Sequence, residues 1–299
     1  MSASSIPVFD QLARTHARLE ARLEAGRGRG AAIWTHDVDR VSYEDTALHT
    51  VSLYLDHGEE SRRLDRGAIR GHAGALCLMP QGSRSDWAIG GRFRFVHLYL
   101  DDARLRHFAA ETLGRDPARV ALPDLTYYEE PGLAAAMRGL ARVCAAGDAF
   151  AAEAVIAEIC HRLLTTPIHG GLADRPVRGG LSPAVSRRVI AMMAERLDRP
   201  PSLDELAAEA GLSPFHFQRM FRASHGLPPH AHLEAMRIDE AKRLMRAGDG
   251  LAEVASACGW CHQSAFTRSF RAATGLTPGA WRRAAGLAVA EVSRTARDA

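Results

Sequence analysis

The chain has 299 residues and a mass of 32.4 kDa, which exceeds one average domain, so two domains are expected. Apolar residues make up 46% and charged residues 24%, which supports buried cores and excludes a disordered tail. No run of about 18 uncharged apolar residues and no secretory signal occur, and five cysteines do not make a disulfide framework in a chain of this length. We expect a soluble cytoplasmic protein with no membrane partner.

The first hundred residues change from a helical to a strand-like pattern. Apolar side chains of residues 7–25 recur at three- and four-residue steps, which predicts a helix that ends at the glycines 26, 28 and 30. Segments rich in Val, Tyr, Phe and Leu then alternate with Gly, Asp and Pro up to residue 100. The clearest strand candidates are AAIWTH, ALHTVSLYLDH, GALCLMP and RFRFVHLYL. Strands without intervening helices suggest a compact antiparallel barrel or sandwich.

Three helices and a linker follow the strands. Helical spacing returns at 101–113 and in two alanine-rich amphipathic stretches, 132–146 and 148–164. Residues 165–180 have no period and are rich in Gly, Pro and Arg, which is typical of an interdomain linker. The predicted organisation is one domain at 1–166, a linker at 167–180, a second domain at 181–285 and a tail at 286–299.

Everything after the linker has the pattern of helices with marked starts. Ser182-Pro183, Ser213-Pro214 and Thr277-Pro278 each place a capping hydroxyl before a proline at the first helical position. Ser202 and Glu205 form a capping box. The predicted helices are 183–197, 202–210, 214–224, 229–246, 251–258, 263–273 and 278–284.

The charge distribution favours a polyanionic partner for the second domain. The net charge is only +3, but no Asp or Glu occurs from Ala210 to Leu233 or from Val254 to Ala290. These windows contain Arg219, Arg222, Arg268, Arg271, Arg282 and Arg283. A carboxylate facing phosphate is repelled, so acid-free surfaces that carry arginine suit nucleic acid better than a solvated helix face, which usually mixes both signs.

The two windows are copies of one motif. FQRMFRASHGLPP (217–229) matches FTRSFRAATGLTP (266–278) after a shift of 49 residues, and each copy follows a short apolar helix and a glycine turn. Helix, glycine turn and second helix form the helix-turn-helix pattern. The predicted connecting helix, His230–Arg246, would span roughly 25 Å. With the widths of the flanking units, the two second helices could lie about 34 Å apart, which is one turn of the major groove.

Residues 181–285 resemble the AraC/XylS family of bacterial transcription regulators, whose DNA-binding domain is a seven-helix pair of helix-turn-helix units. The residues that carry the resemblance are Arg237, Ile238, Ala241, Leu244, Val254, Ala255, Gly259, Trp260, Phe266, Phe270, Arg271, Gly275, Thr277 and Pro278. Cys261-His262 departs from the family, which more often has a small polar or acidic residue at the first position. The resemblance implies that the partner is double-stranded DNA.

By this resemblance, the base-reading residues lie at exposed positions of the two second helices. They are Phe215, His216, Gln218 and Arg219 in the first unit, and His262, Gln263, Ser264, Thr267 and Arg268 in the second. Arg can pair with guanine and Gln with adenine, and Phe or Thr can meet a thymine methyl. Arg222 and Arg271, one turn later, are better placed for phosphates. The aromatic residues of the repeat are assigned to the core.

The resemblance also implies a fold and partners for the first domain. The expected fold class is α+β: an N-terminal cupin-like β-barrel sensor with helical additions, followed by the all-α DNA-binding domain. A small-molecule effector in the sensor, a homodimer formed through 132–164, and RNA polymerase in the case of an activator are the expected further partners. Candidate effector residues are Trp34, Tyr54, Arg62, Arg66 and Trp87. The basic run at 62–70 (Arg62, Arg63, Arg66 and Arg70) could bind an anionic effector, although a solvated surface shared with nearby acidic residues is the preferred interpretation. Aromatic residues of strands are usually core.

Other motifs give little support to an enzyme or a cofactor. Cys258-Gly-Trp-Cys261-His262 spells a redox and a haem-attachment motif, but it falls between two predicted helices rather than after a strand, and no export signal is visible. The histidines form no metal-binding helix pattern, and no hydrolase or nucleotide fingerprint occurs, so we predict no metal, cofactor or catalytic residue. Two alternatives stay open: a constitutive DNA-binding protein whose barrel only dimerises, and a catalytic barrel fused to a DNA-binding domain.

Overall fold

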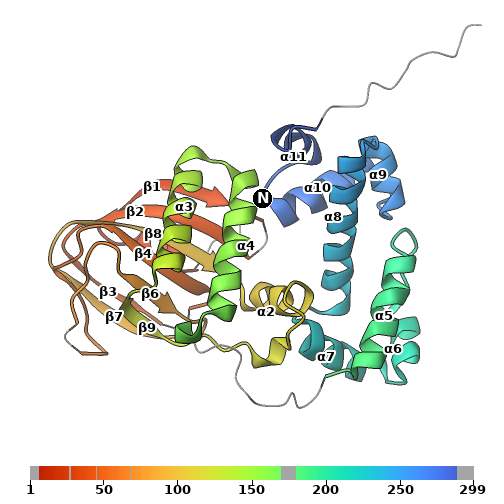
Figure 1. Cartoon of the computed structure of the whole chain (residues 1–299), viewed down its shortest axis with the longest axis horizontal. Helices are drawn as coiled ribbons and strands as arrows, with labels where there is room; N and C mark the ends of the chain where they lie inside the picture. Colours follow the sequence, from red (N-terminus) through yellow and green to blue (C-terminus); the bar gives the residue numbers. More distant parts are fainter. Residues whose placement is uncertain (1–6, 27, 45, 68, 170–179, 288–299) are drawn as a thin grey trace, which may run out of the picture. The chain divides into compact units, whose positions relative to one another are not determined.

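The computed structural model describes residues 7–26, 28–44, 46–67, 69–169 and 180–287, which divide into two compact units (Figure 1). The first unit comprises Met1–Gly180 and Met220–Leu227, and the second comprises Leu181–Arg219 and Pro228–Ala299. Most of the predicted linker (170–179) and of the predicted tail (288–299) lies outside the described residues. In the part of the chain that is described, no helix is long and apolar enough to cross a membrane.

The first unit is built on a six-stranded antiparallel sheet (Figure 1). Its strands, in spatial order, are β1 (Ala17–Glu24), β2 (Arg29–His36), β8 (Phe93–Leu100), β4 (His49–Asp56), β6 (Leu76–Met79) and β9 (Leu125–Tyr128). In the middle of this sheet Ile33 and Leu53 are both paired with Val96. The central strands are buried on both faces, which explains why their sequences form almost continuous apolar runs.

A smaller sheet consists of β3 (Asp39–Tyr43), β7 (Ser85–Ile89) and β5 (Ser61–Arg63). Alternate residues of these strands are buried, as expected for a sheet with one solvated face. Its buried side joins a core that includes Trp87 of β7, Trp34 of β2 and Tyr54 of β4. The sheet-rich N-terminal region is confirmed, but the expected closed barrel is wrong, because the described strands pair into two separate sheets with their own edges.

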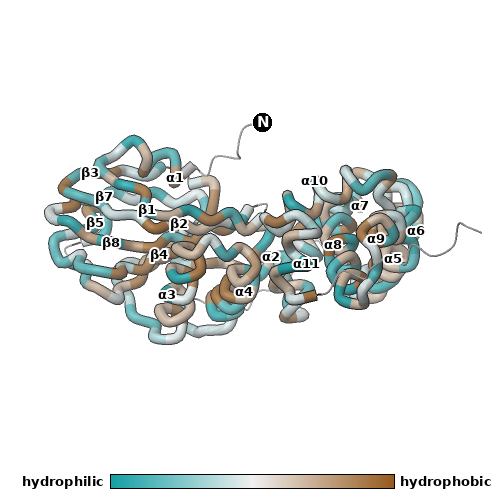
Figure 2. The backbone as a smooth tube through the Cα atoms, turned by 90° about the horizontal axis from the view of Figure 1, so that it is seen from above, coloured by the Kyte–Doolittle hydropathy of each residue, from teal (hydrophilic) through white to brown (hydrophobic). Residues whose placement is uncertain are grey.

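The first unit also contains helices. They are α1 (Pro7–Leu12), α2 (Asp102–Glu111), α3 (Pro131–Ala146) and α4 (Ala149–Thr165), with short 3-10 turns at Pro117–Arg119 and Pro167–His169. Figure 2 shows α3 and α4 on one side of this sheet, where α3 packs against β1, β2, β4 and β8 and α4 packs against α3. Gly147, in the left-handed conformation, turns the chain between the two helices. Their apolar side chains, such as Met137 and Ile159, are buried within the chain.

The predicted helix at 7–25 is wrong beyond its first two turns. Only Pro7–Leu12 is helical, and Ala17–Glu24 is the edge strand β1. Arg18, Glu20, Arg22 and Glu24 alternate with Leu19, Ala21 and Leu23 in this segment. This two-residue period matches the pairing of β1 with β2, which outweighs the weaker helical spacing.

The described residues from 180 onwards form helices, and all seven helices predicted there are confirmed to within two residues at their ends. They are α5 (Pro183–Glu195), α6 (Leu203–Ala210), α7 (Pro214–His225), α8 (Pro229–Ala247), α9 (Leu251–Ala257), α10 (Gln263–Thr274) and α11 (Pro278–Ala284). The hydroxyls of Ser182, Ser202 and Thr277 accept hydrogen bonds from the N–H groups of residues 185, 205 and 280. The capping residues therefore set these helix starts, as their sequence positions predict.

Candidate nucleic-acid interface

The first helix-turn-helix unit consists of α6, a turn at 211–213 and α7. Gly211 ends α6 in the left-handed conformation (φ 66°), and its N–H is bonded to the Ala207 and Ala208 carbonyls. The hydroxyl of Ser213 then accepts a hydrogen bond from the His216 N–H, 3.4 Å away, at the start of α7. The turn is therefore fixed by local hydrogen bonds, and it determines the direction in which α7 leaves α6.

The helix α7 has a buried and an exposed face. Phe217 and Phe221, four residues apart, are both buried. Gln218, Arg219 and Arg222 are exposed on the other side. Phe215, in the first turn, is 80% exposed, which is more than any other large hydrophobic side chain of the described residues. His216 is half-buried, so it contributes less to the exposed face than its neighbours.

The second helix-turn-helix unit repeats this arrangement with α9, a turn and α10. The turn includes Gly259 (φ 76°), and a Cβ there would lie 2.4 Å from both the Arg237 Nη2 and the Leu197 carbonyl oxygen. The Trp260 ring packs on Phe266, with 4.8 Å between ring centroids. Neighbouring Cys258 is buried and Cys261 is exposed, and both are free thiols. The turn therefore locks α10 in place and leaves only Cys261 of the pair at the surface.

The helix α10 again separates a core face from an outer face. Phe266 and Phe270 are buried, and Phe270 meets the buried Trp281 of α11 edge-on. On the outside, His262, Gln263, Ser264, Arg268 and Arg271 are exposed and Thr267 is half-buried. The hydroxyl of Thr267 donates to the Gln263 carbonyl, at 2.9 Å. Neither α7 nor α10 carries a carboxylate.

The connecting helix α8 contacts the second helix-turn-helix unit through polar residues to which the sequence analysis did not assign this role. Its 19 residues span roughly 28 Å. Glu234 accepts a hydrogen bond from Ser269 of α10, at 2.6 Å. Arg237 donates two hydrogen bonds to the Leu197 carbonyl, at 2.8 and 2.9 Å. These contacts use polar groups on the buried side of α8, which a helical apolar pattern does not reveal.

One arginine of the acid-free windows does not belong to the exposed surface. Arg282 is only 4% exposed, and its guanidinium donates to the carbonyl of Asp249. The acid-free window therefore does not place Arg282 on the exposed surface. Arg283, the next residue, is exposed. A helix buries one face, so neighbouring residues of equal charge can have opposite environments.

The N-terminal compact unit, which holds the two sheets, contains a cavity of about 40 Å³ between them. Its walls are mainly aromatic and aliphatic, with a few hydroxyl, imidazole and thiol groups. The lining residues are His36, Val41, Tyr43, Ser52, Tyr54, Ser61, Cys77, Met79, Trp87, Ile89, Phe93, Phe95 and His97. A cavity of this size holds more than one water molecule but is smaller than the roughly 150 Å³ that accommodates benzene in an engineered protein.

Two of the candidate effector residues, Tyr54 and Trp87, line this cavity, and three do not. Trp34 is buried in the surrounding core, where its Nε1 donates to the Tyr99 hydroxyl at 3.2 Å. Arg62 and Arg66 are exposed and lie outside the cavity walls. The structure therefore does not bring the arginines and the aromatic residues together in one site.

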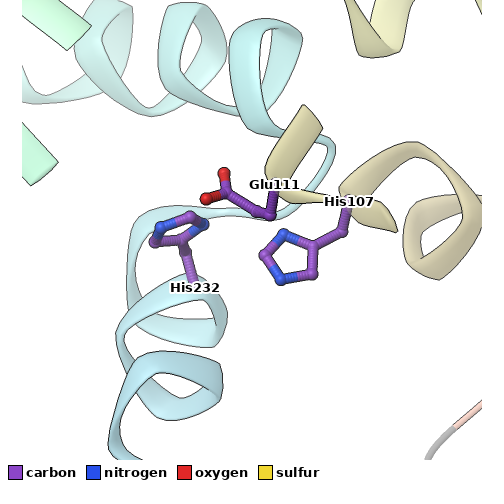
Figure 3. Close-up of side chains that lie close together, drawn as sticks. All are labelled: His107, Glu111 and His232. Carbon is purple, nitrogen blue, oxygen red and sulfur yellow. The ribbon is translucent and has the colours of Figure 1, made fainter. Parts of the chain in front are cut away.

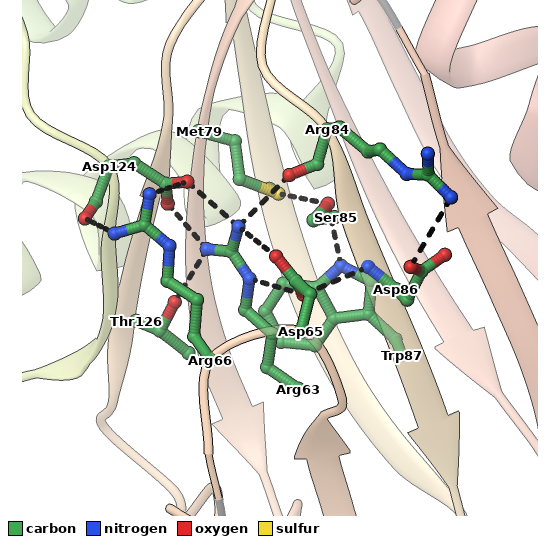
Figure 4. Close-up of polar contacts among 10 residues, drawn as sticks. All are labelled: Arg63, Asp65, Arg66, Met79, Arg84, Ser85, Asp86, Trp87, Asp124 and Thr126. Atoms are coloured by element: carbon green, nitrogen blue, oxygen red, sulfur yellow. Dashed lines mark hydrogen bonds and ion pairs between the residues drawn. The ribbon is translucent and has the colours of Figure 1, made fainter.

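Arg63, between these two arginines, is a buried structural residue (Figure 4). Its guanidinium donates to Asp65 at 3.0 Å, to Asp124 at 2.7 Å, to the Thr126 hydroxyl at 2.8 Å and to the Arg84 carbonyl. Its side chain thereby joins β5 to the segment that leads into β9. The charge of Arg63 is neutralised within the protein, which leaves it without a role in capturing an anion.

The imidazoles of the cavity are uncharged at neutral pH. Burial lowers the pKa of His97 to about 3, and its Nδ1 lies 3.1 Å from the Tyr99 hydroxyl. Burial also lowers the pKa of His36, against the opposing effect of Asp39, whose carboxylate is 3.2 Å from Nε2.

Two further histidines lie on helices: His107 on α2, one turn before Glu111, and His232 in the first turn of α8 (Figure 3). Neither helix by itself supplies the three or four ligands of a protein zinc site.

Comparison with known proteins places this arrangement in a family. A family model described as a helix-turn-helix domain matches residues 206–284, which includes both repeated units. The MmsAB operon regulatory protein of Pseudomonas aeruginosa is 28% identical over 266 residues, which cover 83% of this chain and 78% of that protein. The match of the family model confirms the resemblance of residues 181–285 to the DNA-binding domain of the AraC/XylS family. The matched residues contain both helix-turn-helix units, with α7 and α10 as their second helices.

Two further similarities each cover about a third of the chain or less. The probable transcriptional regulator LumQ of Photobacterium leiognathi is 33% identical over 85 residues, which cover 28% of this chain and 34% of that protein. The chain thus matches about a third of the length of that relative. Among solved structures, the DNA-binding domain of AdpA in complex with a target DNA is 34% identical over 33% of this chain and 90% of its own, with a TM-score of 0.32.

Proposed function

We propose that this protein is a sequence-specific regulator of transcription that enters the major groove of double-stranded DNA with α7 and α10. The observation that carries the proposal is the duplicated face on which Arg219 and Arg268 stand exposed while Phe217 and Phe266 are buried. Neither helix carries an acidic residue to repel phosphate. Regulation of this kind takes place at the chromosome, so the cytoplasm is the proposed location.

The proposed contacts divide into base readers and phosphate ligands. The base readers are Phe215, His216, Gln218, Arg219, His262, Gln263, Ser264, Thr267 and Arg268, and the phosphate ligands are Arg222 and Arg271. Arginine and glutamine have hydrogen-bonding geometries that match guanine and adenine, whereas a backbone phosphate needs only a positive donor. The half-buried His216 and Thr267 are the least accessible members of the first group.

Selection of duplexes from a random-sequence pool tests this proposal. The full chain should enrich a site with two base-specific segments about one helical turn apart, because two helix-turn-helix units read successive major-groove segments. Failure to enrich any sequence, with binding that depends only on salt, would leave a nonspecific DNA-binding protein. The double variant R219A/R268A serves as the control and should lose the enrichment.

We further propose that the first unit senses a small-molecule effector in the cavity between its sheets, and that the chain forms a homodimer through α3 and α4. An effector alters DNA binding only through different affinities for two arrangements of the protein. The effector can be sought by thermal unfolding of the full chain in the presence of each compound of a metabolite panel. A ligand that binds the folded state raises Tm. If no compound raises Tm, the constitutive alternative is favoured.

The dimer is tested by sedimentation of the full chain at several concentrations. The buried apolar residues of α3 and α4 are already covered within one chain, so a dimer would use their outer residues, such as Ala135 and Ala154. Substitution A154R should then shift the chain towards the monomer. RNA polymerase becomes a further partner if selected sites activate a reporter.

A further inference from the structure

We propose that the cavity of the first unit takes a small uncharged molecule, with an apolar body and one hydrogen-bonding group, and excludes carboxylates, phosphates and ammonium ions. This inference rests on the proposed effector function and names the chemical class of the ligand. It differs from the anionic effector that the arginine run at 62–70 suggests from sequence. The cavity walls, rather than the exposed arginines, determine the ligand class.

Among the described residues, no Asp, Glu, Lys or Arg lines the cavity. All of its lining residues are neutral, and each is at most 6% exposed, so a ligand inside would be removed from water. A buried ion without a partner is strongly unfavourable, whereas a buried neutral group needs only a hydrogen bond. The carboxylate of Asp39, bonded to the lining residue His36, would repel a second anion. The site therefore offers an anion no compensating charge.

The aromatic walls do not select a cation either. A ring face attracts a cation, and Tyr54, Trp87 and Phe93 together would suit an ammonium group. However, the guanidinium of Arg63 already lies over the Trp87 ring, 5.6 Å from its centroid. The Trp87 ring is therefore already engaged by one cation, whose charge Asp65 and Asp124 balance, and it is less available to a second. The lining residues themselves supply no carboxylate to balance a cationic ligand.

Hydrogen bonds among the wall hydroxyls limit the polar groups that can meet a ligand. Tyr54 and Ser61 are bonded to each other at 3.1 Å, and Tyr127 donates to the same Ser61 hydroxyl at 2.8 Å. Ser52, two residues before Tyr54 on the central strand β4, adds a further hydroxyl to the walls. Because the volume is only about 40 Å³, the matching molecules are short alcohols and ketones of a few carbon atoms, unless side chains move.

Isosteric probes separate charge from shape. Saturation-transfer NMR on the full chain would compare 2-butanone with propionate, and 1-butanol with butylammonium, since each pair has the same number of heavy atoms. Binding of both neutral probes with at least tenfold weaker signals from the two ions supports the inference. Equal binding of propionate or butylammonium overturns it, and so does the absence of signal from every probe.

A matched pair of variants locates the binding. S52V places an extra methyl group in the cavity, and S42V makes the same change on the exposed side of β3. The neutral probes should lose at least threefold of their signal with S52V and keep it with S42V; equal signals in both variants place binding elsewhere and overturn the inference. Affinity for the selected DNA site is measured in the same samples. Probe binding without any change in DNA affinity supports the ligand class but contradicts the effector role.

Discussion

Arg237 of α8 and Gly259 of the second helix-turn-helix turn are in direct contact, since a Cβ on Gly259 would lie 2.4 Å from the guanidinium Nη2. The same guanidinium holds the Leu197 carbonyl with two hydrogen bonds. The connecting helix, the segment after α5 and the turn before α10 therefore meet at one point. This contact therefore helps to fix the start of α10.

Gly259→Ala should lower the stability of the helical C-terminal domain by about 2–4 kcal/mol. The positive φ of Gly259 and the clash of a Cβ with Arg237 and Leu197 act together. Gly211→Ala is the matched control: it has the same kind of φ at the equivalent turn, but a Cβ there meets nothing within 4 Å. We expect it to cost only about 1 kcal/mol. Urea unfolding of both variants measures the difference, and equal losses would show that the contact with Arg237 is unimportant.

Arg268→Ala and Arg271→Ala should affect DNA binding in different ways. The loss of a base contact should cost about 1–3 kcal/mol on the selected site and relax its sequence preference at one position. The loss of a phosphate contact should weaken matched and scrambled sites alike and reduce the salt slope by about one unit. Titrations of both sites at several salt concentrations distinguish the two effects. Identical behaviour of the two variants would refute this division.

Phe215→Ala should reduce affinity for the selected site without destabilising the fold, because the ring is 80% exposed in the free protein. A thymine methyl is the apolar group that a base edge offers in the major groove. The wild-type chain should therefore bind less tightly when deoxyuridine replaces one thymine of the site, and the variant should not. Phe221→Ala, at a buried position, should instead cost about 3–5 kcal/mol of stability.

Arg63→Met should destabilise the first unit by about 3–5 kcal/mol, since it leaves Asp124 and Asp65 without their buried partner. Arg62→Met, at the neighbouring exposed position, is the control and should change stability by less than about 0.5 kcal/mol. Thermal unfolding compares them. A small effect at position 63 would mean that the polar cluster in Figure 4 does not hold the sheets together.

Acid should weaken the polar cluster formed by Arg63, Asp65 and Asp124. Burial alone raises the pKa of Asp65, but hydrogen bonds from Arg63 and from the Asp86 N–H lower it below its usual value. Because the folded pKa is the lower one, the stabilisation is complete above the unfolded value of about 3.9 and is lost as the pH falls below it. Asp65→Asn should therefore be less stable than wild type at pH 6, and the gap should narrow by pH 3. A constant gap would exclude this linkage.

Local patterns predicted the second unit well and the first unit less well. Ser202, Ser182 and Thr277 mark helix starts by hydrogen bonds within three residues, so the sequence contains the whole signal. Strand β1 depends on its pairing with β2, and β5 and β9 are short strands of three and four residues. Such strands have little pattern of their own, and the separation into two sheets is a tertiary property that no single segment encodes.

The candidate DNA-binding site was likewise predictable where it depends on local patterns and unpredictable where it depends on tertiary contacts. The repeat identified both exposed faces, because the phenylalanines that anchor each helix are spaced by one turn. It could not show that Arg282 is buried or that Arg63 is neutralised by Asp124, since both facts depend on carbonyls and carboxylates distant in the chain. The cavity, likewise, takes its lining from seven strands, β2 to β8, and its charge state from their packing.

Methylation interference at guanine N7 on a selected site tests the central claim most directly, since N7 lies in the major groove. We predict two clusters of interference about 10–11 base pairs apart on one face of the DNA. Arg219→Ala should abolish only one cluster, and Arg268→Ala only the other. A single cluster, or the loss of the same cluster in both variants, would contradict the insertion of α7 and α10 into successive grooves.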